Sequence, residues 1–342
     1  MIGDGVQRLR GRHVVTPTGV LHDAVVVIRD SVIIEVWRAG DQRAAGDRAA
    51  VAHIGDTVLD GWVVPGFVDT HCHGGGGATY ATTDADEARR ARQFHRAHGT
   101  TTALASLVSA DPGTLRAQLT ALRPLVDDGE LAGVHLEGPF LSVKRCGAHD
   151  PTLLRDPDPG VVMDLLDAGG GAVRMITIAP ELAGGLAAIQ MLSTLGVVAA
   201  VGHTDADDAR VAAALDAGAT VVTHLFNAMP AVHHREPGPI PRLLADGRAT
   251  VELIADGFHL HPQVIALAVA AAGPGRVALV TDAMAAAGMP DGDFQLGDLR
   301  VAVREARARL VEPDGSLGSI AGSTLTMDAA FARLVGTGQP IP

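Results

Sequence analysis

Six side chains that can bind a metal ion or transfer a proton follow apolar runs of this sequence, each where the run ends. They are His71, His73, Glu137, His203, His224 and Asp282. Alternate side chains of a strand share a face, so His71 and His73 should point the same way and Cys72 the opposite way. Imidazole and carboxylate groups are ligands of Zn²⁺ and similar ions. Any one of these residues alone would more often be a hydrogen-bonded core residue, but their recurrence at strand ends indicates a metal-dependent hydrolase.

The apolar runs alternate with helical patterns along the chain. The expected strands span 63–70, 101–108, 131–136, 173–179, 197–202, 219–225, 251–255 and 276–281. Helical patterns rich in Ala, Leu and Arg cover 84–98, 112–125, 152–167 and 205–217. The strands lack alternating polarity, which indicates burial on both faces. This pattern favours an α/β fold, a (β/α)8 TIM barrel with its chemistry at the C-terminal strand ends. An open doubly wound parallel sheet is the alternative.

A small β domain is expected to precede the barrel. Residues 1–60 carry short β-like runs without a long helical pattern, and part of 296–318 is expected to join them. The barrel would then take residues 61–342. A helical run from 324 to 335 comes shortly before the last residue, so the β-sandwich would be incomplete and its strand edges exposed.

Composition narrows the classes of partner. The formal net charge of −12 argues against nucleic acid and anionic membranes as general partners. The sequence has no apolar run of membrane-spanning length, and residues 1–5 lack the features of a signal peptide. Cys72 and Cys146 are the only two cysteines, too few for a disulfide framework. A cytoplasmic protein is therefore expected.

Several segments carry a resemblance to a known family. The opening Pro65-Gly66-Phe67-Val68-Asp69-Thr70-His71-Cys72-His73 and the late Asp282 resemble the amidohydrolase superfamily. Segments 135–140, 147–150, 201–204, 223–229 and 321–323 are similar to the N-acetylglucosamine-6-phosphate deacetylase family within it. Many amidohydrolases bridge two metals with a carboxylated lysine. Lys144, the only lysine, lies in a polar loop, so Glu137 is expected to be the bridging or sole carboxylate.

The resemblance implies a reaction and a metal. The reaction is hydrolysis of the acetamide of N-acetyl-D-glucosamine 6-phosphate, giving D-glucosamine 6-phosphate and acetate in amino-sugar catabolism and cell-wall recycling. Glu137, His203 and His224 would be the primary metal ligands, while His71 and His73 leave a second metal open. Zn²⁺ is the expected ion, with Fe²⁺, Mn²⁺ and Co²⁺ as alternatives.

The resemblance also implies roles around that metal. Asp282 would be the general base and acid, and His149 would donate a hydrogen bond to the developing oxyanion. The implied substrate contacts are Ala148, Asn227, Ala228, Arg235, His259, Ile320, Ala321 and Gly322. Arg235 would bind the phosphate of a neighbouring subunit in a homodimer, because arginine can bind phosphate through two hydrogen bonds. Cys146 would be either a plain loop residue or a reactive thiol.

Three rival readings stay open at this point. An N-acetylgalactosamine-6-phosphate deacetylase would differ only in the orientation of one substrate hydroxyl. A metal-dependent deaminase of a purine-like ring would release ammonia, but the cluster around Arg235 argues against it. A truncated, non-catalytic paralogue that binds sugar phosphates would bind its ligand without releasing acetate.

Overall fold

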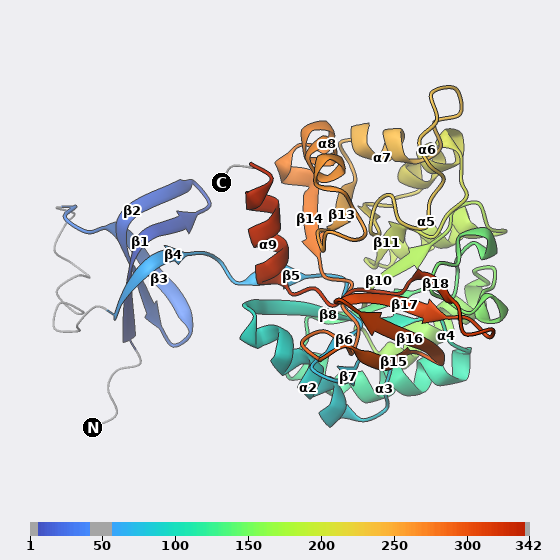
Figure 1. The fold of residues 1–342 in the computed structure, drawn as a ribbon, viewed down its shortest axis with the longest axis horizontal. Helices are drawn as coiled ribbons and strands as arrows, with labels where there is room; N and C mark the ends of the chain where they lie inside the picture. Colours follow the sequence, from blue (N-terminus) through green and yellow to red (C-terminus); the bar gives the residue numbers. More distant parts are fainter. Residues whose placement is uncertain (1–5, 42–56, 339–342) are drawn as a thin grey trace. The chain divides into compact units, whose positions relative to one another are not determined.

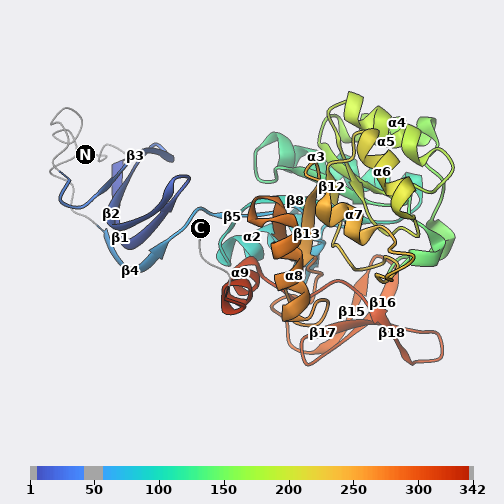
Figure 2. The same ribbon diagram turned by 90° about the horizontal axis from the view of Figure 1, so that it is seen from above.

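The computed structural model describes residues 6–41 and 57–338, which divide after Gly66 into two compact units. Three predictions concern residues outside this range. They are the lack of signal-peptide features in residues 1–5, the part of the small β domain at 42–56, and the last residues of the barrel at 339–342. Figure 1 and Figure 2 show the two units in two orientations. Each unit is described by itself.

The first unit is a four-stranded sheet. Its strands are β1 (Val6–Thr16), β2 (Gly19–Arg29), β3 (Val32–Arg38) and β4 (Thr57–Val63), in the order β3-β2-β1-β4. Strand β2 is antiparallel to β1 and β3, while β4 runs parallel to β1. Because side chains alternate along a strand, β2 supplies two small clusters of buried residues: Val25 and Val27 pack with Trp37, and Val26 packs with Val14.

The second unit contains the predicted eight parallel barrel strands. They are β5 (Phe67–Asp69), β8 (Thr100–Val108), β9 (Gly133–Glu137), β10 (Val173–Ile178), β11 (Val198–Val201), β12 (Val221–Val222), β13 (Thr250–Ile254) and β14 (Val277–Val280). Their order is β14-β13-β12-β11-β10-β9-β8-β5, in which each strand pairs with its neighbours in the chain. This topology, with the helices placed around the strands (Figure 1), confirms the predicted barrel.

Helices follow most of these strands and cover the outside of the barrel. They are α2 (Ala85–Ala97), α3 (Pro112–Asp127), α4 (Pro159–Gly169), α5 (Gly185–Thr194), α6 (Asp208–Asp216), α7 (Ile240–Ala245), α8 (Pro262–Ala272) and α9 (Met327–Gly336). The prediction of one helix over 152–167 was wrong at its start. A short 3₁₀ turn covers Pro151–Leu153, and α4 begins only at Pro159. Asp158 caps α4 by accepting hydrogen bonds from two of its first amides, as expected for an Asp–Pro start.

The barrel closes between β14 and β5 without a regular strand ladder. Asp69 on β5 accepts hydrogen bonds from the backbone N–H of Thr281 at 3.2 Å and from its hydroxyl at 2.6 Å. One residue further on, the N–H of Asp282 donates to the carbonyl of His71 at 2.8 Å. The buried carboxylate of Asp69 therefore takes the place of some of the backbone hydrogen bonds that join the other barrel strands. It does so beside two predicted site residues, His71 and Asp282.

A second antiparallel sheet belongs to the larger unit. Its strands are β15 (Gly292–Leu296), β16 (Leu299–Arg304), β17 (Arg307–Val311) and β18 (Leu317–Ile320). Val301 and Val303 pack with Val108 of the barrel and with Met284. Within the described part of the chain these strands pair only with one another, and they pack beside the barrel (Figure 2). The prediction that part of 296–318 joins the small β domain therefore differs from the observed arrangement.

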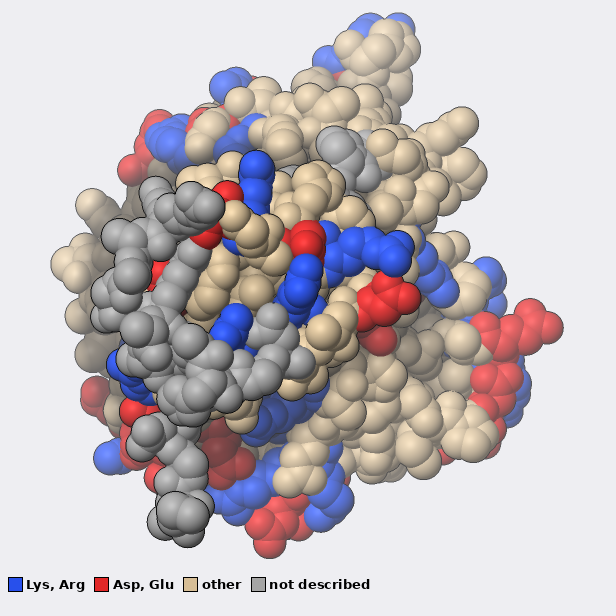
Figure 3. All heavy atoms as spheres, turned by 90° about the vertical axis from the view of Figure 1, so that its left-hand side faces the viewer, with Lys and Arg blue, Asp and Glu red and all other residues tan. Residues whose placement is uncertain are grey.

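The surface carries both signs of charge. On the face drawn in Figure 3, Lys and Arg side chains are interspersed with Asp and Glu side chains. Among the described residues, no helix combines the length and the apolar character needed to cross a bilayer.

Candidate metal centre and substrate cavity

His71 and His73 lie just beyond the C-terminal end of β5 and point toward the same place. Their Nε2 atoms are 3.1 Å apart, whereas the thiol of Cys72 points the other way, to His95 Nε2 at 3.2 Å. The predicted alternation of these side chains is confirmed. Cys72 is buried, and burial raises the pKa of its thiol to about 12. It therefore stays a neutral core residue.

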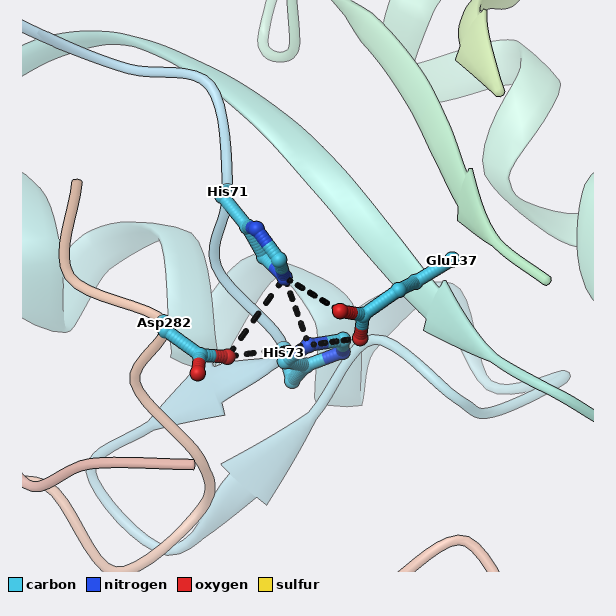
Figure 4. Close-up of side chains that lie close together, drawn as sticks. All are labelled: His71, His73, Glu137 and Asp282. Atoms are coloured by element: carbon cyan, nitrogen blue, oxygen red, sulfur yellow. Dashed lines mark hydrogen bonds and ion pairs between the residues drawn. The ribbon is translucent and has the colours of Figure 1, made fainter. Parts of the chain in front are cut away.

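Four buried side chains form a first group of possible ligands: His71, His73, Glu137 and Asp282. Figure 4 shows them converging from the ends of three different strands. Asp282 Oδ1 lies 3.4 Å from His71 Nε2 and 3.2 Å from His73 Nε2. On the other side, Glu137 Oε1 lies 3.4 Å from His71 Nε2, and Glu137 Oε2 lies 3.1 Å from His73 Nε2.

A second group meets the first at Glu137. Its Oε1 atom also lies 3.1 Å from His203 Nε2 and 3.0 Å from His224 Nε2, and these two nitrogens are 3.1 Å apart. One carboxylate thus faces four imidazoles that come from the ends of β5, β11 and β12. This is the geometry that a bridging carboxylate needs, whereas the sequence left open whether Glu137 would be the bridging or the sole carboxylate.

Hydrogen bonds at Nδ1 define the neutral tautomers of two predicted ligands, His73 and His203. His73 Nδ1 lies 3.1 Å from the carbonyl of Ser106, and His203 Nδ1 lies 2.8 Å from the carbonyl of Arg145. Because a carbonyl only accepts, Nδ1 carries a proton in both residues, and in the neutral imidazole Nε2 then presents a lone pair. In their neutral forms both rings therefore direct lone pairs toward the carboxylate oxygens of Glu137.

His149 has the opposite arrangement. The backbone N–H of Ser109 donates to its Nδ1 at 3.3 Å, so the proton sits on Nε2, which lies 3.4 Å from Glu137 Oε2. Burial lowers the pKa of His149 to about 4, against the opposing effect of Glu137. His149 is therefore a neutral imidazole that presents an N–H donor, as the predicted contact with an oxyanion requires.

The donor set fits a divalent cation. Lone pairs on imidazoles and carboxylates face one another at hydrogen-bonding distance, and such contacts repel unless a proton or a cation lies between them. In the absence of a metal, protons would fill these contacts. Burial lowers the pKa of His73, but hydrogen bonds and negative charge from Asp282 and Glu137 raise it to about 9. The same histidines hold the pKa of Asp282 near 2 against its burial. A metal ion would replace these protons.

Three of the site residues have an unusual backbone. His203, His224 and Asp282 adopt positive φ angles of 47°, 27° and 48°, in the left-handed region that L-residues seldom enter. Each lies two positions beyond the last residue of a barrel strand. The turn in the backbone directs these side chains toward the centre of the barrel mouth.

A cavity of about 390 Å³ opens above the two groups. The predicted residues that line it are His73, Glu137, Ala148, His149, His203, His224, Asn227, Ala228, His259, Asp282, Ile320 and Gly322. The cavity is also lined by residues that were missed: Lys144, Arg145, Gly147, Leu296 and Ser319. Arg145 and Lys144 belong to a 3₁₀ turn, and both pair with Asp205. The only sequence feature that could have indicated their place in the cavity was positive charge near His149 in an acidic chain.

Three predicted residues do not line this cavity. Ala321 is buried between two residues that do. His71 lies beneath the cavity, fully buried. Arg235 is exposed, in the loop before α7, where its guanidinium contacts His234 Nε2 at 2.6 Å. Cys146 lies one residue from the lining residue Gly147 and is half-buried.

Comparisons with known proteins agree with this architecture. The model of the amidohydrolase family matches residues 62–311, and the chain belongs to this family. The resemblance read from the sequence is thus confirmed.

Individual relatives point to a narrower group within this family, the deacetylases of phosphorylated amino sugars. N-acetylglucosamine-6-phosphate deacetylase of Bacillus subtilis (strain 168) is 37% identical over 281 residues, covering 79% of this chain and 68% of the relative. N-acetylgalactosamine-6-phosphate deacetylase of Escherichia coli O157:H7 is 35% identical over 335 residues, covering 96% and 83%. A structure of N-acetyl-D-glucosamine-6-phosphate deacetylase from Mycobacterium smegmatis, a mutant in complex with N-acetyl-D-glucosamine-6-phosphate, is 46% identical with a TM-score of 0.91, covering 98% of this chain and 85% of that chain.

Proposed function

We propose that this protein hydrolyses the acetamide of N-acetyl-D-glucosamine 6-phosphate to D-glucosamine 6-phosphate and acetate. One observation carries the proposal: Glu137 joins two histidine groups directly below a cavity that also holds Asp282 and His149. The 46% identity with the Mycobacterium smegmatis deacetylase, which covers 98% of this chain, supports the substrate assignment. The reaction belongs to amino-sugar catabolism and cell-wall recycling.

The protonation states of Asp282 and His149 support the proposed catalytic roles. Asp282 has a low pKa, so at neutral pH it is an anion able to take a proton from water and deliver it to the leaving amine. His149 donates its Nε2 proton in a hydrogen bond to the carbonyl oxygen as negative charge develops there. A divalent ion held by Glu137, His203 and His224 would polarise water and the amide carbonyl. His71 and His73, with Glu137 and Asp282, would hold a second ion.

The metal, the compartment and the assembly are part of the proposal. Zn²⁺ suits the histidine-rich donor set, and Fe²⁺, Mn²⁺ or Co²⁺ would suit it too. We propose a cytoplasmic homodimer in which Arg235 binds the substrate phosphate in the neighbouring site. Arg235 is exposed and lies outside the cavity of its own chain, which is consistent with its binding substrate in the neighbouring subunit. His259 and the amide of Asn227 would complete the phosphate and sugar contacts.

Acetate release from N-acetyl-D-glucosamine 6-phosphate by the Zn²⁺-supplied chain tests this proposal. We expect turnover that stops on chelation and returns with metal. Bound metal and bound substrate without acetate release would contradict it and favour the non-catalytic paralogue. Ammonia release from a purine would instead favour a deaminase.

The galactosamine epimer is the second candidate substrate. The Escherichia coli N-acetylgalactosamine-6-phosphate deacetylase aligns over 96% of this chain, so the epimer must be assayed in parallel. The ratio of kcat/KM for the two sugars decides between them, because discrimination is set by that ratio. A higher kcat/KM for the galacto sugar would reverse the assignment.

A further inference from the structure

Glu252 is a buried carboxylate to which the proposed mechanism gives no role. It lies in the middle of β13, between Val251 and Leu253, with 1% of its surface exposed. An ionised side chain in such a place is costly unless it is well hydrogen-bonded. The hydrogen-bond partners of this buried carboxylate must therefore be identified.

The partners of Glu252 belong to both ligand groups. The hydroxyl of Thr70 donates to its Oε1 at 2.7 Å. His71 Nδ1 lies 3.4 Å from its Oε2, and the backbone N–H of His224 donates to the same oxygen at 3.4 Å. The carbonyl of Glu252 also accepts from the N–H of Leu225 at 2.8 Å. One residue of β13 thus contacts chain segments that follow β5 and β12.

His71 differs from the other predicted ligands in what holds its Nδ1 proton. His73 and His203 donate that proton to neutral backbone carbonyls, whereas His71 faces a carboxylate. A carboxylate at Nδ1 fixes the imidazole's orientation and makes Nε2 a stronger ligand. Among these three histidines, the ligand strength of His71 alone depends on a charged side chain.

We propose that Glu252 is a positioning residue that makes His71 a metal ligand and thereby sets the affinity of the group formed by His71, His73, Glu137 and Asp282. The inference rests on the proposed metal centre. It assigns to Glu252 the binding of one ion and not of both, because the Glu252 carboxylate meets the ring of His71 at Nδ1 but contacts His224 only at its backbone N–H.

Glu252→Gln in the full chain tests the inference, since it keeps the shape and removes the charge. Zn²⁺ binding is measured by competition with a chromophoric chelator, and the metal content by elemental mass spectrometry. We expect the wild type to bind two ions. In Glu252→Gln one ion should bind about 10- to 100-fold more weakly, with the other unchanged. Circular dichroism and the thermal midpoint report folding.

Two further variants separate positioning from a general structural role. Thr70→Val removes a donor to the same carboxylate but leaves His71 Nδ1 in place, so both ions should bind as in the wild type. His71→Asn removes the ligand itself, and adding Glu252→Gln to it should weaken binding no further, since contacting residues in one network are non-additive. Should Glu252→Gln not fold, Glu252→Asp, which keeps the charge but shortens its reach, should show the same selective loss.

Three results would overturn the inference: wild-type affinity for both ions in a folded Glu252 variant, equal weakening of both ions, or a wild-type protein that binds a single ion. These results are independent of catalysis. A wild-type chain that binds two ions but releases no acetate would refute the proposed reaction and leave the role of Glu252 intact.

Discussion

At the scale of single residues, hydrogen bonds to Nδ1 divide the histidines by their proposed roles. His73 and His203 donate from Nδ1 and, when neutral, present lone pairs at Nε2, while His149 accepts at Nδ1 and presents a proton. The backbone group behind each ring thus suits it to act as a ligand or as a donor. Sequence spacing gave the positions of these residues, but it could not give their tautomers, since Ser106, Ser109 and Arg145 lie on other segments.

Asp282→Asn separates proton transfer from metal binding. We expect kcat for acetate release to fall by about 10²–10⁴-fold, the usual contribution of a general acid–base group. The ion held by Glu137, His203 and His224 should remain, because Asp282 is not part of that group. Elemental analysis of the variant checks this, and loss of all metal would contradict the assigned role.

At the scale of elements, the loop after β13 depends on a single carboxylate. Asp256 accepts hydrogen bonds from the backbone N–H groups of Phe258 and His259 and from His259 Nδ1, at 2.7–2.8 Å. Burial raises the pKa of Asp256, but the interactions with His259 outweigh this and leave it below its ordinary value of 3.8. The stabilisation is therefore complete above pH 3.8 and is lost as the pH falls through the folded-state pKa.

Asp256→Asn should accordingly be a pH-dependent change. We expect the free energy of unfolding at pH 7 to fall by about 1.5–3 kcal/mol, the usual contribution of a hydrogen bond to a charged group. The difference from the wild type should shrink as the pH falls below 3.8. Urea unfolding of both proteins across this range measures it, and a constant difference would contradict the assignment.

The closure of the barrel by Asp69 gives a second prediction at this scale. Thr281→Val removes the hydroxyl that donates to Asp69 and leaves that buried carboxylate short of a donor, which should cost about 2 kcal/mol of unfolding free energy. Thr100→Val is the matched control. Thr100 is equally buried, but its hydroxyl has no hydrogen-bond partner in the described part of the chain. Equal losses in the two variants would contradict the role of Asp69 in closing the barrel.

The elements themselves were largely predictable. Apolar runs of strand length alternated with helical patterns, and this alternation fixed the barrel and placed the site at its strand ends. The partners of β15–β18 were not predictable, because alternating apolar residues indicate a strand but not the sheet that it joins. The start of α4 was missed because helical periodicity outweighed the Asp158–Pro159 signal. Glu252 was missed because a lone polar residue hardly alters an apolar run.

At the scale of the whole molecule, the proposed dimer makes a prediction about mixed subunits. Arg235→Ala should raise KM for the phosphorylated sugar, and Asp282→Asn should lower kcat by about 10²–10⁴-fold. Refolded together in equal amounts, they should regain about one quarter of wild-type activity at low substrate, since half of the dimers are mixed and each has one intact site. No recovery would mean that Arg235 serves its own chain. Arg210→Ala, an exposed arginine on α6, is the control.

The left-handed backbone at His203, His224 and Asp282 lowers the stability of the fold in order to place side chains of the proposed site. Each residue holds a conformation that glycine adopts freely and that costs another residue about 1–2 kcal/mol. Asp282→Gly should therefore be more stable than Asp282→Ala by about 1 kcal/mol in thermal or urea unfolding, although neither can transfer a proton. Random mutagenesis screened for heat tolerance alone should accumulate glycines at these three positions. Directed evolution of a more durable enzyme would need to select for acetate release at every round.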